Sequence, residues 1–437
     1  MTATLGAIVL LLVLGLPIAR CVDRRGDALV LAGTAFLYGS GAMYLVLFAL
    51  SMLGISWTAV SVGLAGLIVF GVATYFAMRR GPPAGPMRIP GLHVIDVLTL
   101  AVVAGYAVYA TLAPPWEVDF WAIWGLKARA FLEAGGIDWR FLESRWNAFQ
   151  HPDYPLLVPL DYDFAGVLGG QWNDRGTGLF SVAWGVSLIL VVRSLASRAM
   201  APTCASLTAL ALAASCLAPR VGLAEGALVA FGGASLLFLR EALREGDASA
   251  WLHGALLLGF AADCKNEGLA LMASVALALA IAGPRPEIAS RLKRLWPACL
   301  LALPWIAVRA LHALPTDLAN AGMLDRFLDR LGHAGQVFGL LASHLFLPWA
   351  WASLVAAFLV VPAAAIARER FVIAALSIQL AFFVAAYFAT PYNVEWHIWT
   401  SWSRLTGQLT VPLSFVAMSM LAAAISGGTA RGPTKST

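Results

Sequence analysis

Apolar stretches long enough to cross a lipid bilayer follow one another along almost the whole sequence. A spanning helix needs about 20 consecutive apolar residues, and roughly thirteen runs approach that length. Ala, Leu and Gly dominate them, and no long strand-like alternation is present, so helices are the only sensible spanning element. The sequence therefore predicts an all-α polytopic membrane protein with about 13 transmembrane helices. The runs lie near residues 3–19, 28–53, 57–78, 92–113, 176–193, 202–218, 222–240, 250–264, 266–283, 296–313, 335–361, 371–390 and 405–426.

Composition excludes a soluble globular protein. The 437 residues are 60% hydrophobic and only 12% charged, more apolar surface than one soluble core hides. A net charge of +5 would suit a nucleic-acid partner, but the basic residues lie in short loops between apolar runs, so no such partner is expected. Five scattered cysteines show no metal-site or disulfide spacing. The run from Leu5 to Ala19 lacks the basic leading region of a signal peptide and is predicted as a helix.

Basic residues alternate between successive loops, which predicts the topology. One set of loops is rich in Lys and Arg and the opposite set is poor, so the positive-inside rule places the first set in the cytoplasm. The segments 114–159, 263–268, 314–334 and 391–403 then lie outside the cytoplasmic membrane. The residues of the cytoplasmic set are Arg20, Arg24, Arg25, Arg79, Arg80, Arg88, Arg193, Arg198, Arg240, Arg244, Arg285, Arg291, Lys293, Arg294, Arg368, Arg370, Arg431 and Lys435.

Three regions are predicted along the chain. A stiff proline-rich linker at 82–86 separates an N-terminal three-helix transmembrane extension, 1–91, from the remainder. Residues 92–283 form a transmembrane core that includes the outer loop 114–159. The C-terminal helices of 284–437 are expected to complete a cavity.

The outer loop 114–159 combines many charged residues with tryptophans and tyrosines, a composition typical of a membrane–water boundary. Within it, residues 122–133 are predicted to form a short amphipathic helix in the interface, and residues 323–331 a second one in another outer loop. The stretch 151–155 contains two prolines and is not expected to begin as regular helix.

Two carboxylates, Glu117 and Asp119, follow the predicted helix that ends before Pro114. A carboxylate there could take a proton from an acceptor hydroxyl, or the pair could hold a divalent cation, Mg²⁺ or Mn²⁺, against a phosphate. The spacing demands neither role. Two solvated loop acids at a helix exit remain the alternative.

Lys265 and Glu267 lie between two apolar runs, with Asp263 beside them. Charges at such a depth are costly and usually face a cavity or one another. Lys265 would suit a phosphate and Glu267 could orient it. A tight turn whose charges face water is the alternative.

Other candidates lie near the predicted outer ends of apolar runs. Glu225 is an intramembrane acid that could line a site or pair with Arg220. In 392–404, aromatic faces including Trp396 could hold a sugar or lipid and Arg404 a phosphate, although an aromatic belt is the alternative for the tryptophans. His151 and His397 are lone histidines without the spacing of a zinc site, so no metal ligand is assigned.

The order of these motifs resembles the C-type membrane glycosyltransferases, in particular the branch of protein mannosyltransferases, aminoarabinose transferases and lipopolysaccharide-core sugar transferases. Glu117-Val-Asp119 looks like the modified acidic motif of that superfamily. The stretch 151–156 is similar to the branch's His/Lys-Pro-Pro-Leu element, and 260–268 to its Gly-x-x-x-x-Thr-Lys-Gly element. Glu225 falls where the branch often has an acid at a helix start.

The likeness runs from about residue 98 to about residue 283, with weaker support from Arg404 onward. Asp153 stands where the branch has its second proline, and Cys264 replaces the threonine. Three spans also precede the helix 92–113, which corresponds to the usual first one. These departures concern the subfamily and the sugar more than the superfamily.

The resemblance implies a GT-C fold and an inverting transfer of a hexosyl or pentosyl group from a polyprenyl-phosphate donor to a glycan, lipid or protein acceptor at the outer face of the cytoplasmic membrane. Asp119 would be the general base with Glu117 as its neighbour, and Lys265 and Arg404 would bind the donor phosphate. The resemblance assigns no definite cofactor, and a divalent cation, Mg²⁺ or Mn²⁺, stays open as considered above. The residues expected to contact substrate are His151, Asp153, Tyr154, Glu225, Glu267, Trp396 and His397.

Other classes of protein remain open. A transporter or flippase for a lipid-linked or polar solute would predict polar or broken helices at the bilayer midplane and internal repeats. A non-catalytic scaffold would not require Asp119 and Lys265 to approach each other. A polymerase or ligase with a diphosphate-linked donor would call for more outer arginines than Arg129, Arg140, Arg145 and Arg404. Convergence of Asp119, His151, Lys265 and Arg404 on one outward-facing cavity would favour the transferase.

Overall fold

The computed structural model describes residues 1–81, 86–216, 221–282, 285–316, 320–344 and 349–425, and these residues are helical without strands. The linker residues 82–85, Arg220 and the C-terminal tail lie outside this part. Short 3-10 helices occur at Arg145–Gln150 and Arg285–Glu287, and a π-helix, η1, at Phe120–Trp124. The α-helices are α1 (Thr2–Val22), α2 (Ala28–Met52), α3 (Ala59–Arg80), α4 (Val94–Leu112), α5 (Gly125–Ala134), α6 (Trp139–Glu143), α7 (Leu157–Gly169), α8 (Asp174–Ala199), α9 (Pro202–Cys216), α10 (Ala224–Glu245), α11 (Ala248–Ala262), α12 (Asn266–Ile281), α13 (Ile288–Lys293), α14 (Trp296–Leu311), α15 (Met323–Gly332), α16 (Ala334–Ser343), α17 (Trp349–Val360), α18 (Ala363–Arg368), α19 (Arg370–Ala389), α20 (Val394–Gln408) and α21 (Thr410–Ile425).

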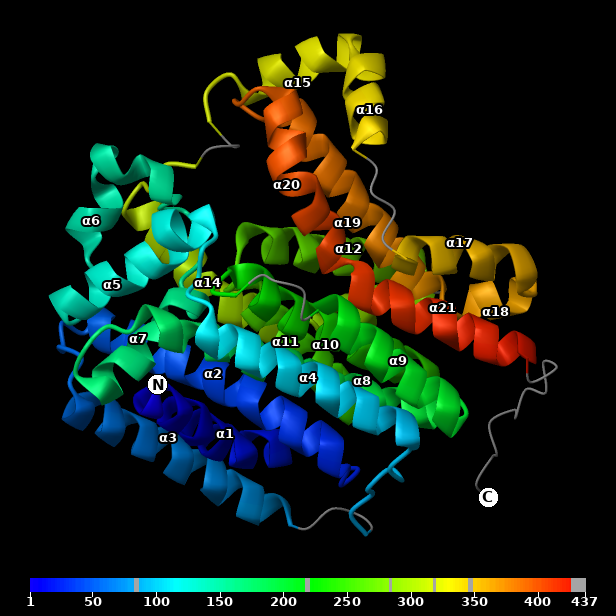
Figure 1. The fold of residues 1–437 in the computed structure, drawn as a ribbon, viewed down its shortest axis with the longest axis horizontal. Helices are drawn as coiled ribbons and strands as arrows, with labels where there is room; N and C mark the ends of the chain where they lie inside the picture. The colour runs from blue at the N-terminus through cyan, green and yellow to red at the C-terminus, as the bar shows by residue number, and fades with distance from the viewer. Residues whose placement is uncertain (82–85, 217–220, 283–284, 317–319, 345–348, 426–437) are drawn as a thin grey trace.

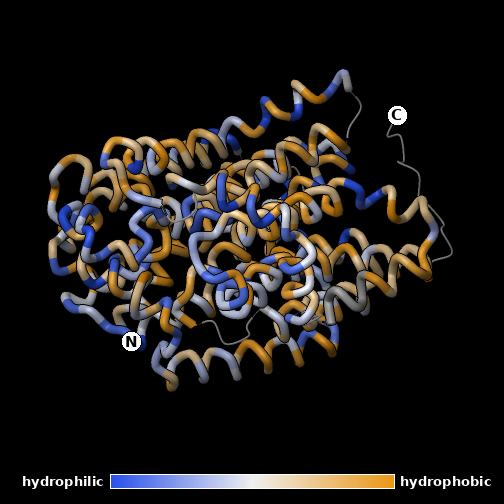
Figure 2. Tube along the Cα trace, turned by 90° about the horizontal axis from the view of Figure 1, so that it is seen from above, coloured by the Kyte–Doolittle hydropathy of each residue, from blue (hydrophilic) through white to orange (hydrophobic). Residues whose placement is uncertain are grey.

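The predicted all-α membrane architecture is confirmed, whereas the count of 13 spans stays a prediction. Among the described residues, 7 helices are long and apolar enough to cross a membrane, or 8 if the bent pair α20 and α21 is one span. Those 7 are α1, α2, α3, α4, α8, α10 and α19, and five further apolar helices are shorter. Figure 2 shows hydrophobic residues along most of the helical tube, with hydrophilic residues prominent in the connections.

Two of the predicted runs are broken. Instead of one helix over 335–361, α16 ends at Ser343 and α17 begins at Trp349. The run 405–426 is divided between α20 and α21, which meet at an angle of 46°. A hydropathy average over a whole run does not reveal such breaks, because the apolar residues on both sides of a short polar stretch outweigh it.

Of the N-terminal helices, α2 packs against α7 and α8 within the bundle, whereas α3 lies along its edge beside α1 (Figure 1). α1 and α2 approach so closely that a Cβ on Gly15 would overlap the carbonyl oxygen of Ala35, and one on Gly39 would overlap that of Leu11. Small residues at a helix interface permit this separation in membranes. The division into an extension, a core and a C-terminal part stays a prediction.

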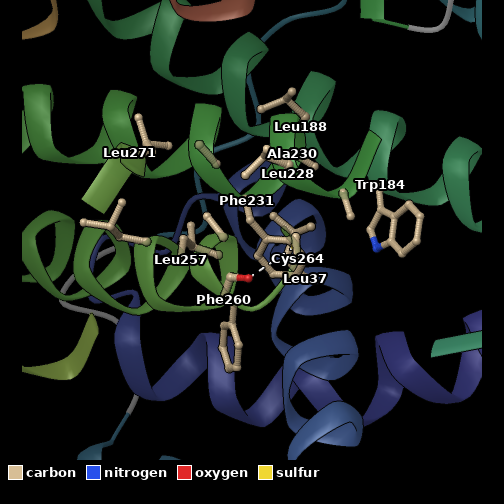
Figure 3. Close-up of a cluster of buried hydrophobic side chains, with 14 of the residues drawn as sticks. Leu37, Trp184, Leu188, Leu228, Ala230, Phe231, Leu257, Phe260, Cys264 and Leu271 are labelled. Atoms are coloured by element: carbon tan, nitrogen blue, oxygen red, sulfur yellow. Dashed lines mark hydrogen bonds between the residues drawn. The ribbon is translucent and has the colours of Figure 1, made fainter. Parts of the chain in front are cut away.

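Large apolar side chains from α2, α8, α10, α11 and α12 meet in one buried cluster (Figure 3). Leu37 from α2 lies near Phe260 from α11 and Phe231 from α10, whose rings are 5.8 Å apart. Cys264 follows α11, and its thiol donates to the carbonyl of Phe260 at 3.2 Å. This cluster packs against α10 and α12, whose first turns carry Glu225 and Glu267.

Arginines from the predicted cytoplasmic loops meet acids at one end of the bundle. Arg25 pairs with Glu241 at 2.7 Å and with Asp247 at 2.9 Å, and Arg198 pairs with Asp27 at 2.9 Å. These residues lie between α1 and α2, at the end of α8 and at the end of α10. Loops that the sequence assigns to one side of the membrane therefore come together in space.

The loop 114–159 contacts the other end of α2. The backbone N–H of Trp57 donates to the carbonyl of Gly135 at 2.7 Å, and that of Ile137 donates to the Ser51 hydroxyl at 2.9 Å. Ser51 and Asp27 are separated by about 36 Å along α2, close to the thickness of a bilayer's hydrocarbon core. The two sets of loops thus lie at opposite ends of the bundle, as the alternation of charge predicts.

Helices occupy both segments predicted to be interfacial. The segment 122–133 begins as η1 and continues as α5, and α15 begins at Met323 as predicted. The stretch 151–155 is not helical, and α7 begins at Leu157. Location of these helices in the membrane interface stays a prediction.

The close contact of α1 and α2 predicts a strong effect of Gly39→Ala. The added methyl group must displace backbone of α1, and overpacking of this kind costs about 1–3 kcal/mol. We expect a clearly lower melting temperature in detergent. Gly63→Ala in α3 is the matched control, because nothing lies within 4 Å of its Cβ position. Equal melting temperatures for the two variants would contradict the close packing.

Candidate functional site

Five charged residues from distant parts of the chain meet at the end of the bundle where the loop 114–159 lies. This charged cluster consists of Asp119, Glu225, Lys265, Glu267 and Arg404. The ammonium of Lys265 lies 3.1 Å from Glu225 Oε1 and 2.8 Å from Glu267 Oε1. The Arg404 guanidinium donates to Asp119 Oδ2 and lies 3.6 Å from Glu225 Oε1. The contacts form one continuous chain of opposite charges.

The charged cluster is dry on one side and reachable on the other. The side chains of Glu225 and Lys265 are 1% and 6% exposed, whereas those of Asp119 and Arg404 are 28% and 23% exposed. Electrostatic interactions strengthen as water is excluded. A substrate would therefore reach Asp119 and Arg404 first, with Lys265 and Glu225 deeper in the protein.

Helix starts place the two deeper acids. Glu225 lies in the first turn of α10 and Glu267 in the first turn of α12, where the positive end of the helix dipole stabilises a carboxylate. Lys265 immediately precedes α12. Gly268 lies so close to Ala261 that a Cβ there would overlap its carbonyl oxygen, so the turn into α12 requires glycine.

Lys265 stays charged in spite of its burial. Loss of hydration lowers the pKa of a buried ammonium, but the carboxylates of Glu225 and Glu267 outweigh that effect and hold the pKa of Lys265 above its usual value. A permanently charged lysine in a dry setting suits an anionic ligand.

An aromatic stack lies beside the charged cluster. It consists of Trp124, Tyr154 and His151: the Tyr154 ring is stacked 5.6 Å from that of Trp124 and 4.7 Å from that of His151. The Lys265 ammonium lies 5.8 Å from the centre of the Tyr154 ring, within cation–π range. His151 and Tyr154 therefore join the site through this ring.

Lys127 is a site neighbour that the sequence analysis did not single out. It is completely buried in α5, donates to the His151 carbonyl at 2.5 Å and lies 5.7 Å from the centre of the Tyr154 ring. Burial lowers the pKa of Lys127 to about 7, against an opposing effect of the Asp153 carboxylate. The sequence offered only one signal for Lys127, its position in the predicted amphipathic helix 122–133. In the structure α5 packs against α7, and this packing buries the lysine.

The segment that carries the aromatic stack is tied to the turn before α12. Asn266 donates to Asp153 Oδ2 at 2.8 Å, and the Leu157 N–H donates to the Asp263 carbonyl at 3.0 Å. His151 has a φ of 53°, a strained value for a side-chain-bearing residue. Asp153 thus holds backbone geometry, and its carboxylate faces Asn266 rather than the charged cluster.

Trp396 and His397 are placed apart from the charged cluster. They lie near the start of α20, where Asn393, Glu395, Trp396, Trp399 and His344 line an open recess of about 300 Å³. His397 bonds the Thr390 hydroxyl at 2.9 Å. Trp396 precedes Arg404 by about 12 Å along the helix.

Glu117 helps to begin the π-helix, because its carbonyl accepts the N–H of Phe120 at 3.0 Å. That helix opens directly after Asp119. Among the described residues, no group of three or more His, Cys, Asp or Glu side chains could hold a metal ion.

A narrow apolar cavity of about 20 Å³ lies beside Glu267. A volume of this size holds about one water molecule, so no lipid chain occupies it without movement of the surrounding helices. Its other lining residues come from α10, α12, α19, α20 and α21 and the α20–α21 junction: Leu228, Gly232, Gly233, Leu236, Leu271, Leu376, Gln379, Gln408, Leu409 and Pro412.

The fold and site define a multi-pass helical membrane protein with an ion-paired centre at one end of its bundle. Residues 153–312 match the family model of dolichyl-phosphate-mannose-protein mannosyltransferases. This confirms the resemblance to membrane glycosyltransferases of the GT-C type, which take the sugar from a lipid-linked donor. No curated protein and no solved structure gives a significant match. The matched region contains Glu225, Lys265 and Glu267, whereas Asp119 and Arg404 lie outside it.

The buried Lys127 predicts a characteristic dependence of stability on pH. In the unfolded chain its pKa returns to about 10.4, so between pH 7 and 10.4 the unfolded state binds more protons and the free energy of unfolding rises with pH. Lys127→Met removes this contribution. We expect the melting temperature of wild type, relative to Lys127→Met, to increase from pH 6 to pH 9. The exposed Lys293→Met serves as control, and a difference independent of pH would contradict the prediction.

Proposed function

We propose that the chain moves a hexosyl or pentosyl group from a polyprenyl-phosphate donor to an acceptor at the outer face of the cytoplasmic membrane, with inversion at the anomeric carbon. The observation that carries this proposal is the convergence of Asp119, Lys265 and Arg404 in one partly exposed charged cluster. The family match over 153–312 supports the reaction class and the lipid-linked donor. The acceptor would be a glycan, a lipid or a protein.

Lys265 and Arg404 would bind the donor phosphate. Negative charge grows on the phosphate as its bond to the sugar breaks, and fixed cations in a water-poor site stabilise that charge. Lys265 provides a buried point charge, and Arg404 a planar guanidinium suited to two oxygens at once. The guanidinium now binds Asp119 and would share its donors with the phosphate.

Asp119 would serve as the general base. The acceptor oxygen forms a bond to the anomeric carbon, the bond from that carbon to the phosphate oxygen breaks, and the acceptor proton passes to the Asp119 carboxylate. The partial exposure of Asp119 allows an acceptor to approach, and the ion pair with Arg404 would orient the Asp119 carboxylate between acceptor and donor. Glu117, two residues earlier, would act as its neighbour.

The remaining predicted residues would position the substrates. His151 and Tyr154 present ring faces beside Lys265, and Asp153 fixes the segment that carries them. Glu225 and Glu267 orient Lys265. Trp396 would contact a more distant part of the acceptor in the recess at the start of α20, and His397, the next residue, would support that contact.

Transport of a lipid-linked or polar solute is the second candidate function. Asp161 and Asp163 in α7 are completely buried, and buried acids in a helical bundle often mark ion or proton paths. Mass spectrometry of cell-envelope glycans and polyprenyl-linked sugars, with and without the gene, distinguishes the two. If the protein is a transferase, deletion of its gene leaves the lipid-linked donor unconsumed and the product glycan missing. If it is a transporter, deletion changes the side of the membrane on which a solute accumulates.

Asp119→Asn is expected to abolish transfer, because an amide cannot accept the acceptor proton. The measurement is the cell-envelope glycan that disappears when the gene is deleted, tested after complementation with the variant. Protein amount in the membrane and melting temperature should stay near wild type. Asp325→Asn, an exposed acid in α15, should restore the glycan fully. Full restoration by Asp119→Asn would remove the base assignment.

Lys265→Ala is expected to weaken binding of undecaprenyl phosphate at least tenfold, because the variant lacks the deepest cation of the site. The protein is studied as the purified full chain in lipid nanodiscs. Lys293→Ala, at the predicted cytoplasmic side, should bind like wild type. An unchanged affinity in Lys265→Ala would exclude the phosphate role of this lysine.

A further inference from the structure

One carboxylate oxygen lies between both cations of the charged cluster. Glu225 Oε1 is 3.1 Å from the Lys265 ammonium and 3.6 Å from the Arg404 guanidinium. The recorded pairings of the other two acids are different, since Glu267 pairs with Lys265 and Asp119 with Arg404. Glu225 is thus the acid that connects the two cations.

Glu225 Oε1 lies close to both cations that a bound phosphate would also contact. A phosphate held by Lys265 and Arg404 together must bring its non-bridging oxygens within hydrogen-bonding reach of both cations, through one oxygen or through two. That place already holds an anion, in a side chain that is 1% exposed and fixed in the first turn of α10. Donor and Glu225 therefore compete for the same two partners.

The charge of the cluster makes this competition costly for the bound phosphate. Three carboxylates and two cations give a net charge of −1 before any ligand arrives. Like charges repel strongly where water is scarce. A phosphate that enters beside Glu225 is bound less tightly than two buried cations alone would allow.

We propose that the Glu225 carboxylate competes with the substrate phosphate for Lys265 and Arg404. It pairs with both cations in the empty site, and it pairs with them again as the polyprenyl phosphate product leaves. This inference rests on the proposed transferase function. The donor is a phosphate diester with one negative charge. Glycosyl transfer breaks the bond from the anomeric carbon to the phosphate oxygen and leaves the electron pair on that oxygen, so the product carries up to two negative charges.

The product would therefore bind two buried cations more tightly than the donor does. Such a site would be blocked by its own product unless another anion returned to the cations. Glu225 is placed to do this, because its rigid helix start keeps the carboxylate beside them. The residue thus sets the balance between donor binding and product release.

The test is the affinity and dissociation rate of undecaprenyl phosphate, measured by calorimetry and by rapid dilution with the full-length protein in nanodiscs. Glu225→Gln removes the competing charge but keeps the side-chain size. We expect it to bind at least tenfold more tightly than wild type and to release the lipid more slowly. Glu267→Gln is the matched control: it removes a carboxylate that is ion-paired with Lys265 and more distant from Arg404, and it should tighten binding clearly less.

Equal or weaker binding by Glu225→Gln overturns the inference, and so does an equal or larger effect of Glu267→Gln. Glu225→Asp provides a second measurement if the amide variant does not fold, because the shorter carboxylate cannot reach both cations and binding should tighten moderately. Unchanged affinity in Glu225→Asp then also overturns the inference. If Lys265→Ala loses binding while the Glu225 variants bind like wild type, the role of Glu225 as a competitor is refuted and the transferase proposal stands. No binding by wild type or any variant refutes the transferase proposal as well.

Discussion

Ion pairs among five charged side chains hold together the end of the bundle where the loop 114–159 lies. Asp119 follows α4, Glu225 begins α10, Lys265 and Glu267 begin α12, and Arg404 lies on α20, so four separate segments depend on the same ion pairs. A buried charge without a partner is strongly destabilising, which makes each pairing a constraint on where the helices can end. The apolar cluster around Phe260 packs against α10 and α12, the helices whose first turns carry Glu225 and Glu267. The ion pairs that fix the ends of these segments therefore involve the same side chains that form the charged cluster.

Charge and hydropathy predicted much of this arrangement. The alternation of basic loops correctly grouped the segments 114–159 and 263–268 at one end of the bundle, because each spanning helix reverses the side on which the chain emerges. The direct pairing of Arg404 with Asp119 was not predicted, because hydropathy and charge do not give the course of α20 relative to the loop 114–159. Lys127 was missed because a lysine in an amphipathic helix normally faces water, and only tertiary packing buries it.

The N-terminal helices illustrate a second limit of the sequence. A proline-rich linker suggests a separable extension, yet α2 packs against α7 and α8 and contributes to the central cluster. Ser40 on α2 donates to the carboxylate of Asp161 in α7, and a Cβ on Gly41 would collide with Phe260. A proline-rich segment is a local sequence signal. The contacts of the helices on either side of it depend on side chains that are more than a hundred residues away. The contacts of α2 with α7, α8 and α11 are therefore found only in the folded chain.

The bend between α20 and α21 gives α20 the geometry of a lever. Arg404 is five residues from the bend at Leu409 and Trp396 is thirteen, or about 8 Å and 20 Å along the axis. A tilt of about 10° around that point would carry the helix axis at Trp396 through about 3.4 Å and the axis at Arg404 through about 1.3 Å. Any displacement of the start of α20 about this point would therefore be about two and a half times smaller at the backbone of Arg404.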